Sequence, residues 1–201
     1  MPEQVKITLF TFDELPEESQ QKILEGFQQD YDPDYSHIYY EFINDMSENY
    51  GADISVDDIQ WSGFWSQGDG ACFTCDFDEE VIETMLRAEL SEDDRAHLDR
   101  LGVRFNSIKS IRTGPSNFYS HENTVTGKIS FYCSDDTELK VEVISAMEAH
   151  LTDIIRRSCK DLYQRLEDYY DEETSEEALK QRITEYFPGC HFRKDGTIFA
   201  R

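Results

Sequence analysis

The sequence predicts an α+β fold, an antiparallel sheet built from hairpins with helices packed on it. Segments that alternate between apolar and polar residues come in pairs along the chain, and segments with helical spacing of apolar residues cluster between those pairs. Strand pairs joined by short turns are antiparallel, so this order favours an α+β fold over a doubly wound parallel one. The 201 residues are 38% hydrophobic and 13% aromatic, without an internal repeat or a clear linker. We therefore predict a single domain over residues 1–201.

A strand and two helices are predicted at the start of the chain. Alternating β-branched and aromatic residues over 5–12 predict the strand. Pro16 followed by acidic residues is typical of a helix start, and the apolar stripe after it extends to about residue 29. Ser36 is expected to cap the second helix, whose apolar residues continue at helical spacing to about residue 50.

The middle of the chain alternates hairpins with short helices. Extended segments around a glycine-rich turn predict a hairpin over 61–77, and a second hairpin is predicted over 103–133. Between them, the sequence predicts a helix that opens at residues 78–80 and a shorter one over 91–101. We expect both hairpins to belong to one antiparallel sheet.

A long helix is predicted in the C-terminal part, over about 137–170. Its apolar stripe is long enough to lie across a whole sheet, and we expect it to cover one face. His150 lies on the apolar face of this helix and is predicted to be a core histidine. A further helix over 177–187 and a small hairpin around Asp195 and Gly196 complete the chain.

Basic residues also gather on the long helix. Arg156, Arg157 and Lys160 form a small basic patch. Asp153 and Asp161 lie within helical pairing distance of them, so we predict that intrahelical ion pairs account for the patch.

Charge restricts the classes of partner. The chain has 43 acidic and 19 basic residues, a net charge of −24, and residues 1–100 alone carry 26 acidic and 5 basic residues. Direct binding to a phosphate backbone needs clustered Lys and Arg. An anionic membrane surface likewise attracts basic residues and repels a protein with a large negative charge. The charge therefore predicts neither a nucleic-acid nor a membrane partner, but a protein with a basic surface.

Cysteine usage and the N-terminus predict a cytoplasmic location. The five cysteines are an odd number, the first residues lack a basic-plus-apolar signal, and no apolar run approaches the ~18 residues that span a bilayer. We expect reduced thiols.

Catalytic and metal-binding patterns are weak, and we predict no catalytic residue, no metal and no cofactor. Cys72 and Cys75 form a CxxC, but residues three apart on a strand face opposite sides, and no second CxxC follows. His121 and Glu122 with Asp69 could form a hydrolytic or metal site, yet no nucleophile, G-x-S-x-G motif or phosphate loop accompanies them.

Two polar loops are the first candidate binding site, with a turn supported by core aromatic residues as the alternative. Both are expected at hairpin tips, and polar side chains beside loop aromatics are typical of recognition sites. We expect the two tips to meet. The candidate residues are Trp65, Gln67 and Asp69 in the first loop and Tyr119, His121 and Glu122 in the second.

These loops also carry a family resemblance. SGFWSQGDGACF at residues 62–73, NFYSHENT at 117–124 and DELPEESQQKIL at 13–24 resemble a family of small acidic proteins of tailed bacteriophages, often labelled antitoxins. At least one such protein is thought to counter a host defence toxin, an ADP-ribosyltransferase that modifies DNA. The resemblance covers about two thirds of the chain and the DGTIF hairpin at 195–199. It implies a counter-defence role in the cytoplasm of an infected bacterium.

An acidic surface is the second candidate site, with a merely solvated face as the alternative. Residues 30–58 hold nine acidic residues and neither Lys nor Arg, and Asp53, Asp57 and Asp58 are the candidates for partner binding. Carboxylates on a rigid scaffold can imitate the phosphates of DNA. We therefore predict a non-enzymatic phage inhibitor of a host defence or toxin protein. The alternatives are a small-ligand or nucleotide-binding protein, hydrolytic or not, that uses the 65–70 and 117–123 loops, and a structural or regulatory phage protein.

Overall fold

The computed structural model describes residues 7–113, 120–134, 140–186 and 189–200. Their contacts divide the chain into two compact units. We call residues 35–167 the central unit, and the residues up to 34 and from 168 onward the terminal unit. Helix α5 (Val141–Glu173) contributes residues to both. That the chain forms a single domain stays a prediction.

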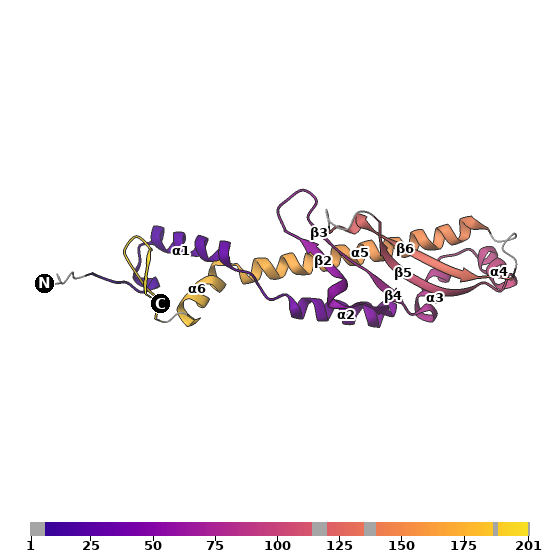
Figure 1. The fold of residues 1–201 in the computed structure, drawn as a ribbon, viewed down its shortest axis with the longest axis horizontal. Coiled ribbons are helices and arrows are strands. Elements are labelled where there is room, and N and C mark those ends of the chain that lie inside the picture. Colours follow the sequence, from indigo (N-terminus) through magenta and orange to yellow (C-terminus); the bar gives the residue numbers. More distant parts are fainter. Residues whose placement is uncertain (1–6, 114–119, 135–139, 187–188, 201) are drawn as a thin grey trace. The chain divides into compact units, whose positions relative to one another are not determined.

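A four-stranded antiparallel sheet lies at the centre of the described part of the central unit, in the order β1–β4–β5–β6. The strands are β1 (Ala52–Asp53), β4 (Cys75–Phe77), β5 (Arg104–Arg112) and β6 (Val125–Tyr132). β5 and β6 are paired along nearly their whole length (Figure 1), and the register has one irregularity between Phe105 and Ser107. The predicted α+β class and the second hairpin are confirmed.

The first hairpin forms a sheet of its own, which corrects the prediction of one shared sheet. β2 (Ile59–Ser62) pairs with β3 (Gly70–Phe73), and only β4 joins the larger sheet. The break lies at Thr74, whose backbone amide donates to the Asp58 carbonyl and whose hydroxyl donates to the Asp58 carboxylate, both at 3.3 Å. These bonds bend the chain, so β3 and β4 lie in different sheets.

Short helices pack around the sheets of the central unit. Each begins or ends at a residue suited to that place: Gly51, with a φ of 63°, follows the last turn of one helix, and Asp78 accepts hydrogen bonds from two amides in the first turn of the next. The predicted helices are confirmed as α2 (Ser36–Tyr50), α3 (Glu79–Ala88) and α4 (Glu92–Arg100). The predicted cap of α2 is wrong, because Ser36 is the first residue of the helix and Tyr35 is at the N-cap position.

Helix α5 packs against β6, an edge strand of the sheet, as Figure 1 shows. Gly127 leaves room for the buried Leu151: a Cβ at this position would come within 2.5 Å of the leucine Cγ. The Gly127 amide donates to Thr152 Oγ1 at 2.9 Å, and the Ile129 amide donates to Glu148 Oε1 at 3.2 Å. The helix therefore fills the core and satisfies edge amides that would otherwise need water.

The terminal unit has a separate core of helical and hairpin residues. Its elements are the 3-10 helix η1 (Phe12–Glu14), α1 (Glu17–Asp30), the last turn of α5, α6 (Glu176–Tyr186), β7 (His191–Phe192) and β8 (Ile198–Ala200). The buried residues are Phe12, Leu15, Ile23, Leu24, Leu179, Ile183, Cys190 and Phe192. The predicted α1, α6 and C-terminal hairpin are confirmed.

The predicted strand over 5–12 is wrong in the part that the structure describes. Only Phe10 pairs, through two backbone hydrogen bonds with Phe192 at 3.0 and 2.9 Å. The next amide, that of Thr11, donates to the Glu14 carboxylate, and this bond turns the chain into η1. The local capping interaction replaces further pairing with the short β7.

No helix in the described residues is both long and apolar enough to cross a membrane.

We expect Gly127→Ala to destabilise the protein by about 2 kcal/mol, because the added methyl group overlaps the buried Leu151 and moves α5 off β6. Gly26→Ala is the control. Gly26 lies inside α1, and no atom beyond its chain neighbours and the backbone of its own helix lies within 4 Å of the place that a Cβ would take, so alanine should stabilise by up to about 1 kcal/mol. Urea unfolding checks both values, and equal stability of the two variants would contradict the packing described.

Candidate functional site

The loop between β2 and β3 rests on an aromatic cluster. The ring of Phe64 stacks on Trp61 at 5.1 Å between centroids and lies 5.6 Å from Tyr163 of α5. Trp61 Nε1 donates to the Tyr39 hydroxyl at 2.7 Å, and the Tyr163 hydroxyl donates to the Gly63 carbonyl at 3.0 Å. Burial raises the pKa of Tyr163, which keeps its hydroxyl a donor. Helices α2 and α5 thus fix the base of the loop.

Asp69 holds the loop itself together. Its carboxylate accepts hydrogen bonds from the backbone amides of Trp65 and Ser66. Gly63 has a φ of 35°, and a Cβ there would lie 2.7 Å from the same carboxylate oxygen, so only glycine fits beside Asp69. Asp69 therefore has a role within its own loop. The structure contains the turn supported by aromatic residues that is the alternative to a binding site at this loop.

Trp65 is displayed at the tip of this fixed loop. Its side chain is 74% exposed, the largest exposure among the exposed large hydrophobic residues of the described chain. Gln67 is exposed beside it. Trp65 thus combines a large apolar surface with a backbone tied down by Asp69.

The second loop meets the first at its base. A Cβ on Gly70 would come within 3.0 Å of the His121 ring, so β3 and the residues before η3 (Glu122–Thr124) are in contact. His121 Nδ1 lies 2.7 Å from Glu122 Oε2, and Lys160 Nζ lies 3.6 Å from Glu122 Oε1. Glu122 is thus surrounded by groups of its own chain. Tyr119, the remaining candidate of this loop, lies outside the described residues.

The three acidic candidates differ in their surroundings. Asp53 and Asp57 are exposed. Asp58 is half-buried: its carboxylate accepts hydrogen bonds from the Ser55 amide and the Thr74 hydroxyl, in the 3-10 helix η2 (Val56–Asp58) and at the strand break. Asp58 therefore serves the fold, whereas Asp53 and Asp57 present their carboxylates to solvent.

The predicted ion pairs of the basic patch on α5 are not formed. Asp161 pairs with Arg165 at 2.9 Å, and the Arg157 Nε donates to the backbone carbonyl of Asp153 rather than to its carboxylate. His150, predicted in the core, is only half-buried and lines a surface hollow. The helical spacing indicated which residues are neighbours on α5, but not which acidic residue forms an ion pair with each basic one.

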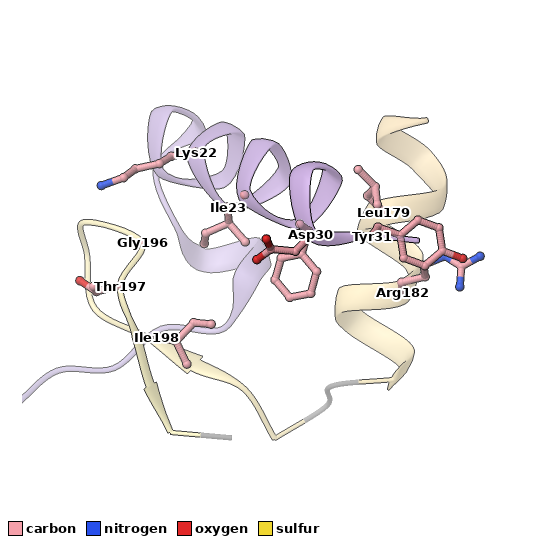
Figure 2. Close-up of a pocket in the computed structure, with 11 residues that line it drawn as sticks. Lys22, Ile23, Asp30, Tyr31, Leu179, Arg182, Gly196, Thr197 and Ile198 are labelled. Atoms are coloured by element: carbon pink, nitrogen blue, oxygen red, sulfur yellow. The ribbon is translucent and has the colours of Figure 1, made fainter. Parts of the chain in front are cut away.

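The terminal unit contains a mostly apolar cavity of about 640 Å³ (Figure 2). Ile23 of α1 and Ile198 of β8 point into it, with Phe27 and Leu179 also on its wall. No pattern in the sequence predicts this cavity, because its walls come from segments about 150 residues apart. No single segment carries a signal for it.

A polar cluster closes one end of that cavity. Arg182 pairs with the Glu173 carboxylate and lies 4.5 Å above the ring of Tyr31. The Tyr31 hydroxyl donates to Glu173 at 2.7 Å. Burial, with this hydrogen bond, raises the pKa of Tyr31 to about 12. The cluster thus joins the end of α1 to α5 and α6 within the terminal unit.

Two of the buried thiols are poor nucleophiles. Cys72, Cys75, Cys159 and Cys190 are buried. Burial raises the pKa of Cys75 to about 12 and also raises that of Cys159, so neither forms a thiolate at neutral pH. In the part of the chain that the structure describes, no group of three or more His, Cys, Asp or Glu side chains could hold a metal ion.

Removing the Asp69 carboxylate tests its role in the loop. We expect Asp69→Ala to lower the free energy of unfolding by about 1–2 kcal/mol, because two backbone amides lose their acceptor. Gln67→Ala, at the exposed tip of the same loop, should leave it within about 0.5 kcal/mol of the wild type. Denaturant unfolding measures both, and a stable Asp69→Ala protein would show that the turn holds without this side chain.

Comparison with known proteins identifies the family. The family model described as a domain of unknown function, DUF8835, matches residues 35–176. No curated protein and no solved structure matches the chain. The matched region contains all of the central unit, including the Trp65 loop, η3 and Asp53, whereas most of the terminal unit and its cavity lie outside it. The chain belongs to the DUF8835 family.

Proposed function

We propose that the protein acts by binding another protein that has a basic surface, and that Trp65 is the anchor of this interface. The observation that carries the proposal is a large apolar side chain held in solvent by a structured loop. Trp65 is 74% exposed, yet its backbone is fixed by Asp69. Tryptophan is among the commonest residues that dominate binding energy at protein interfaces.

The fixed loop makes this anchor favourable for binding. A loop whose backbone is already ordered loses less conformational entropy when a partner covers it. The loop owes its order to contacts from several elements, since Tyr163 of α5 bonds Gly63 and Trp61 stacks on Phe64. Packing within the chain does not explain why a side chain as large as that of Trp65 lies at the surface. Its exposed position therefore favours a role in recognition.

Charge supplies the second part of the proposal. With a net charge of −24, the protein attracts basic partners over long distances and accelerates their association. Asp57 and Trp65 are eight residues apart, on either side of β2, and an extended chain of that length spans at most roughly 27 Å. That distance fits within one interface of ordinary size, about 800 Å² per partner. Asp53 and Asp57 are the carboxylates we place at this interface.

The resemblance of residues 62–73 to proteins of tailed bacteriophages supports a narrower form of the proposal. In this form the partner is a host defence or toxin protein, the location is the cytoplasm of an infected bacterium, and the protein is an inhibitor. Its carboxylates would occupy the positions of nucleic-acid phosphates on the partner. Trp65, Gln67 and Asp69 all lie within the resembling segment.

Capture from a lysate of the bacterial host, followed by binding kinetics with the purified partner, tests the anchor. We expect Trp65→Ala to weaken binding at least about tenfold, because buried aromatic anchors contribute about 2 kcal/mol or more. Tyr132→Ala is the matched control, since Tyr132 is 71% exposed on β6 and has no place in the proposed interface. Equal loss, or no loss, in the two variants would contradict the role of Trp65.

Charge reversal tests the acidic part of the interface. The double variant Asp53→Lys/Asp57→Lys should slow association several-fold at 50 mM salt and much less at 500 mM, with an unchanged melting temperature. Asp171→Lys/Glu172→Lys makes the same change in net charge within the terminal unit and should slow association less. An association rate that does not change with salt concentration would contradict the role of the acidic surface in binding and would indicate that it serves solubility alone.

A further inference from the structure

The surface hollow of about 550 Å³ in the central unit lies between η3 and one face of α5. Residues that follow one another at intervals of three or four along α5 share a helix face. Such residues form one wall, and η3 forms the other. The lining residues are His150, Asp153, Arg156, Arg157 and Lys160 of α5 with Glu122 and Asn123 of η3.

Arg156 carries a donor without an acceptor. Its Nε is one of two buried side-chain nitrogen or oxygen atoms in the described residues that have no hydrogen-bond partner, although the residue as a whole is half-buried. A guanidinium group has five N–H donors in a fixed fork, and a buried donor without an acceptor is costly. An anion in the hollow would contact the part of this guanidinium group that is not buried, and a small rotation of the side chain would bring Nε to the same acceptor.

The neighbouring cations are only weakly engaged. The Arg157 side chain is exposed and donates to a backbone carbonyl at 3.3 Å, which leaves its charge uncompensated by that bond. Lys160 is 68% exposed and lies 3.6 Å from Glu122, whose other oxygen is 2.7 Å from His121. Glu122 therefore keeps a partner if Lys160 turns toward a ligand. Asp161, which helical spacing offered as a partner, is engaged by Arg165.

We propose that this hollow binds the phosphate group of a small molecule, with the guanidinium groups of Arg156 and Arg157 as donors and Lys160 as an additional cation. These three cations outnumber the two carboxylates of the lining, those of Asp153 and Glu122. Arginine is suited to phosphate because two parallel N–H donors match two phosphate oxygens. The Asn123 side-chain amide, on the opposite wall, lies 3.2 Å from His121 Nδ1 through one N–H, and its second N–H can donate to a further polar group of the ligand. This activity goes beyond protein binding and does not depend on Trp65.

The size of the hollow and the charge of the chain narrow the class of ligand. A volume of about 550 Å³ exceeds that of a bare phosphate and lies in the range of drug-sized ligands. A nucleic-acid polymer would extend beyond these few cations. Its remaining phosphates would be repelled by a protein whose net charge is −24, which disfavours such a ligand. The ligand expected is therefore a small phosphate-bearing molecule of nucleotide size.

Titration of the full-length protein with ADP, inorganic pyrophosphate and adenosine tests the proposal, by calorimetry and by thermal shift. We expect ADP and pyrophosphate to bind and to raise the melting temperature, and adenosine and sodium chloride at matched ionic strength to have no effect. Arg156→Gln and Lys160→Gln should each weaken ADP binding at least about tenfold. Lys160 is mostly exposed, so its variant stays informative if Arg156→Gln unfolds.

Arg104→Gln is the control for charge, since Arg104 is an exposed arginine on β5 outside the hollow. It should bind ADP like the wild type. The proposal is overturned if neither ADP nor pyrophosphate binds at millimolar concentration, or if all three variants weaken binding equally. Tighter binding of a single-stranded oligonucleotide than of ADP would also overturn it, in favour of a nucleic-acid site. Trp65→Ala should leave ADP binding intact, so this result and that of the partner-binding experiment are independent.

Discussion

The contact between α5 and β6 is the constraint on which the rest of the central unit depends. Leu151 occupies the space that Gly127 leaves open, while Thr152 and Glu148 accept the edge amides of the same strand. A helix fixed at this point has little freedom to rotate, because each side-chain acceptor matches one backbone donor. Every other residue of α5 in the central unit therefore takes its position from this contact.

Two candidate functional features follow from that one helix. About three turns beyond Leu151, Tyr163 bonds the Gly63 carbonyl and supports the aromatic cluster beneath Trp65. On the same helix face, one and two turns before Tyr163, Lys160 and Arg156 line the hollow beside Glu122. The protein-binding loop and the proposed phosphate site are thus positioned by the same element, although different residues form them.

Long, regular patterns made much of the fold predictable. α2, α5 and the β5–β6 pair each carry many residues at one spacing, and the structure contains all of them. The strand predicted at 5–12 failed because a capping bond between Thr11 and Glu14 outweighed the local alternation. The shared sheet failed because Thr74 bonds back to Asp58 and bends the chain. Single hydrogen bonds of this kind have no counterpart in hydrophobic spacing.

The contact between the two candidate loops was predictable from the sequence, and the roles of their residues were less so. The glycines and aromatic residues of 62–73 indicated a special loop, and its base does contact His121. Nothing in the spacing indicates which carboxylates are used internally, and the structure assigns Asp69 to its own loop and Asp58 to η2. The cavity of the terminal unit and the hollow on α5 depend on segments distant in sequence, so no local pattern indicates either.

The central claim is that Trp65 is exposed on an ordered loop, and NMR relaxation of the backbone amides tests it most directly. The account predicts order parameters near 0.85 for Trp65 and Ser66, similar to those of β3, because the Asp69 carboxylate accepts both amides. Values below about 0.6 at these two residues would show a flexible tip. Trp65 could then not act as a preformed anchor, and the proposed mode of binding would be contradicted.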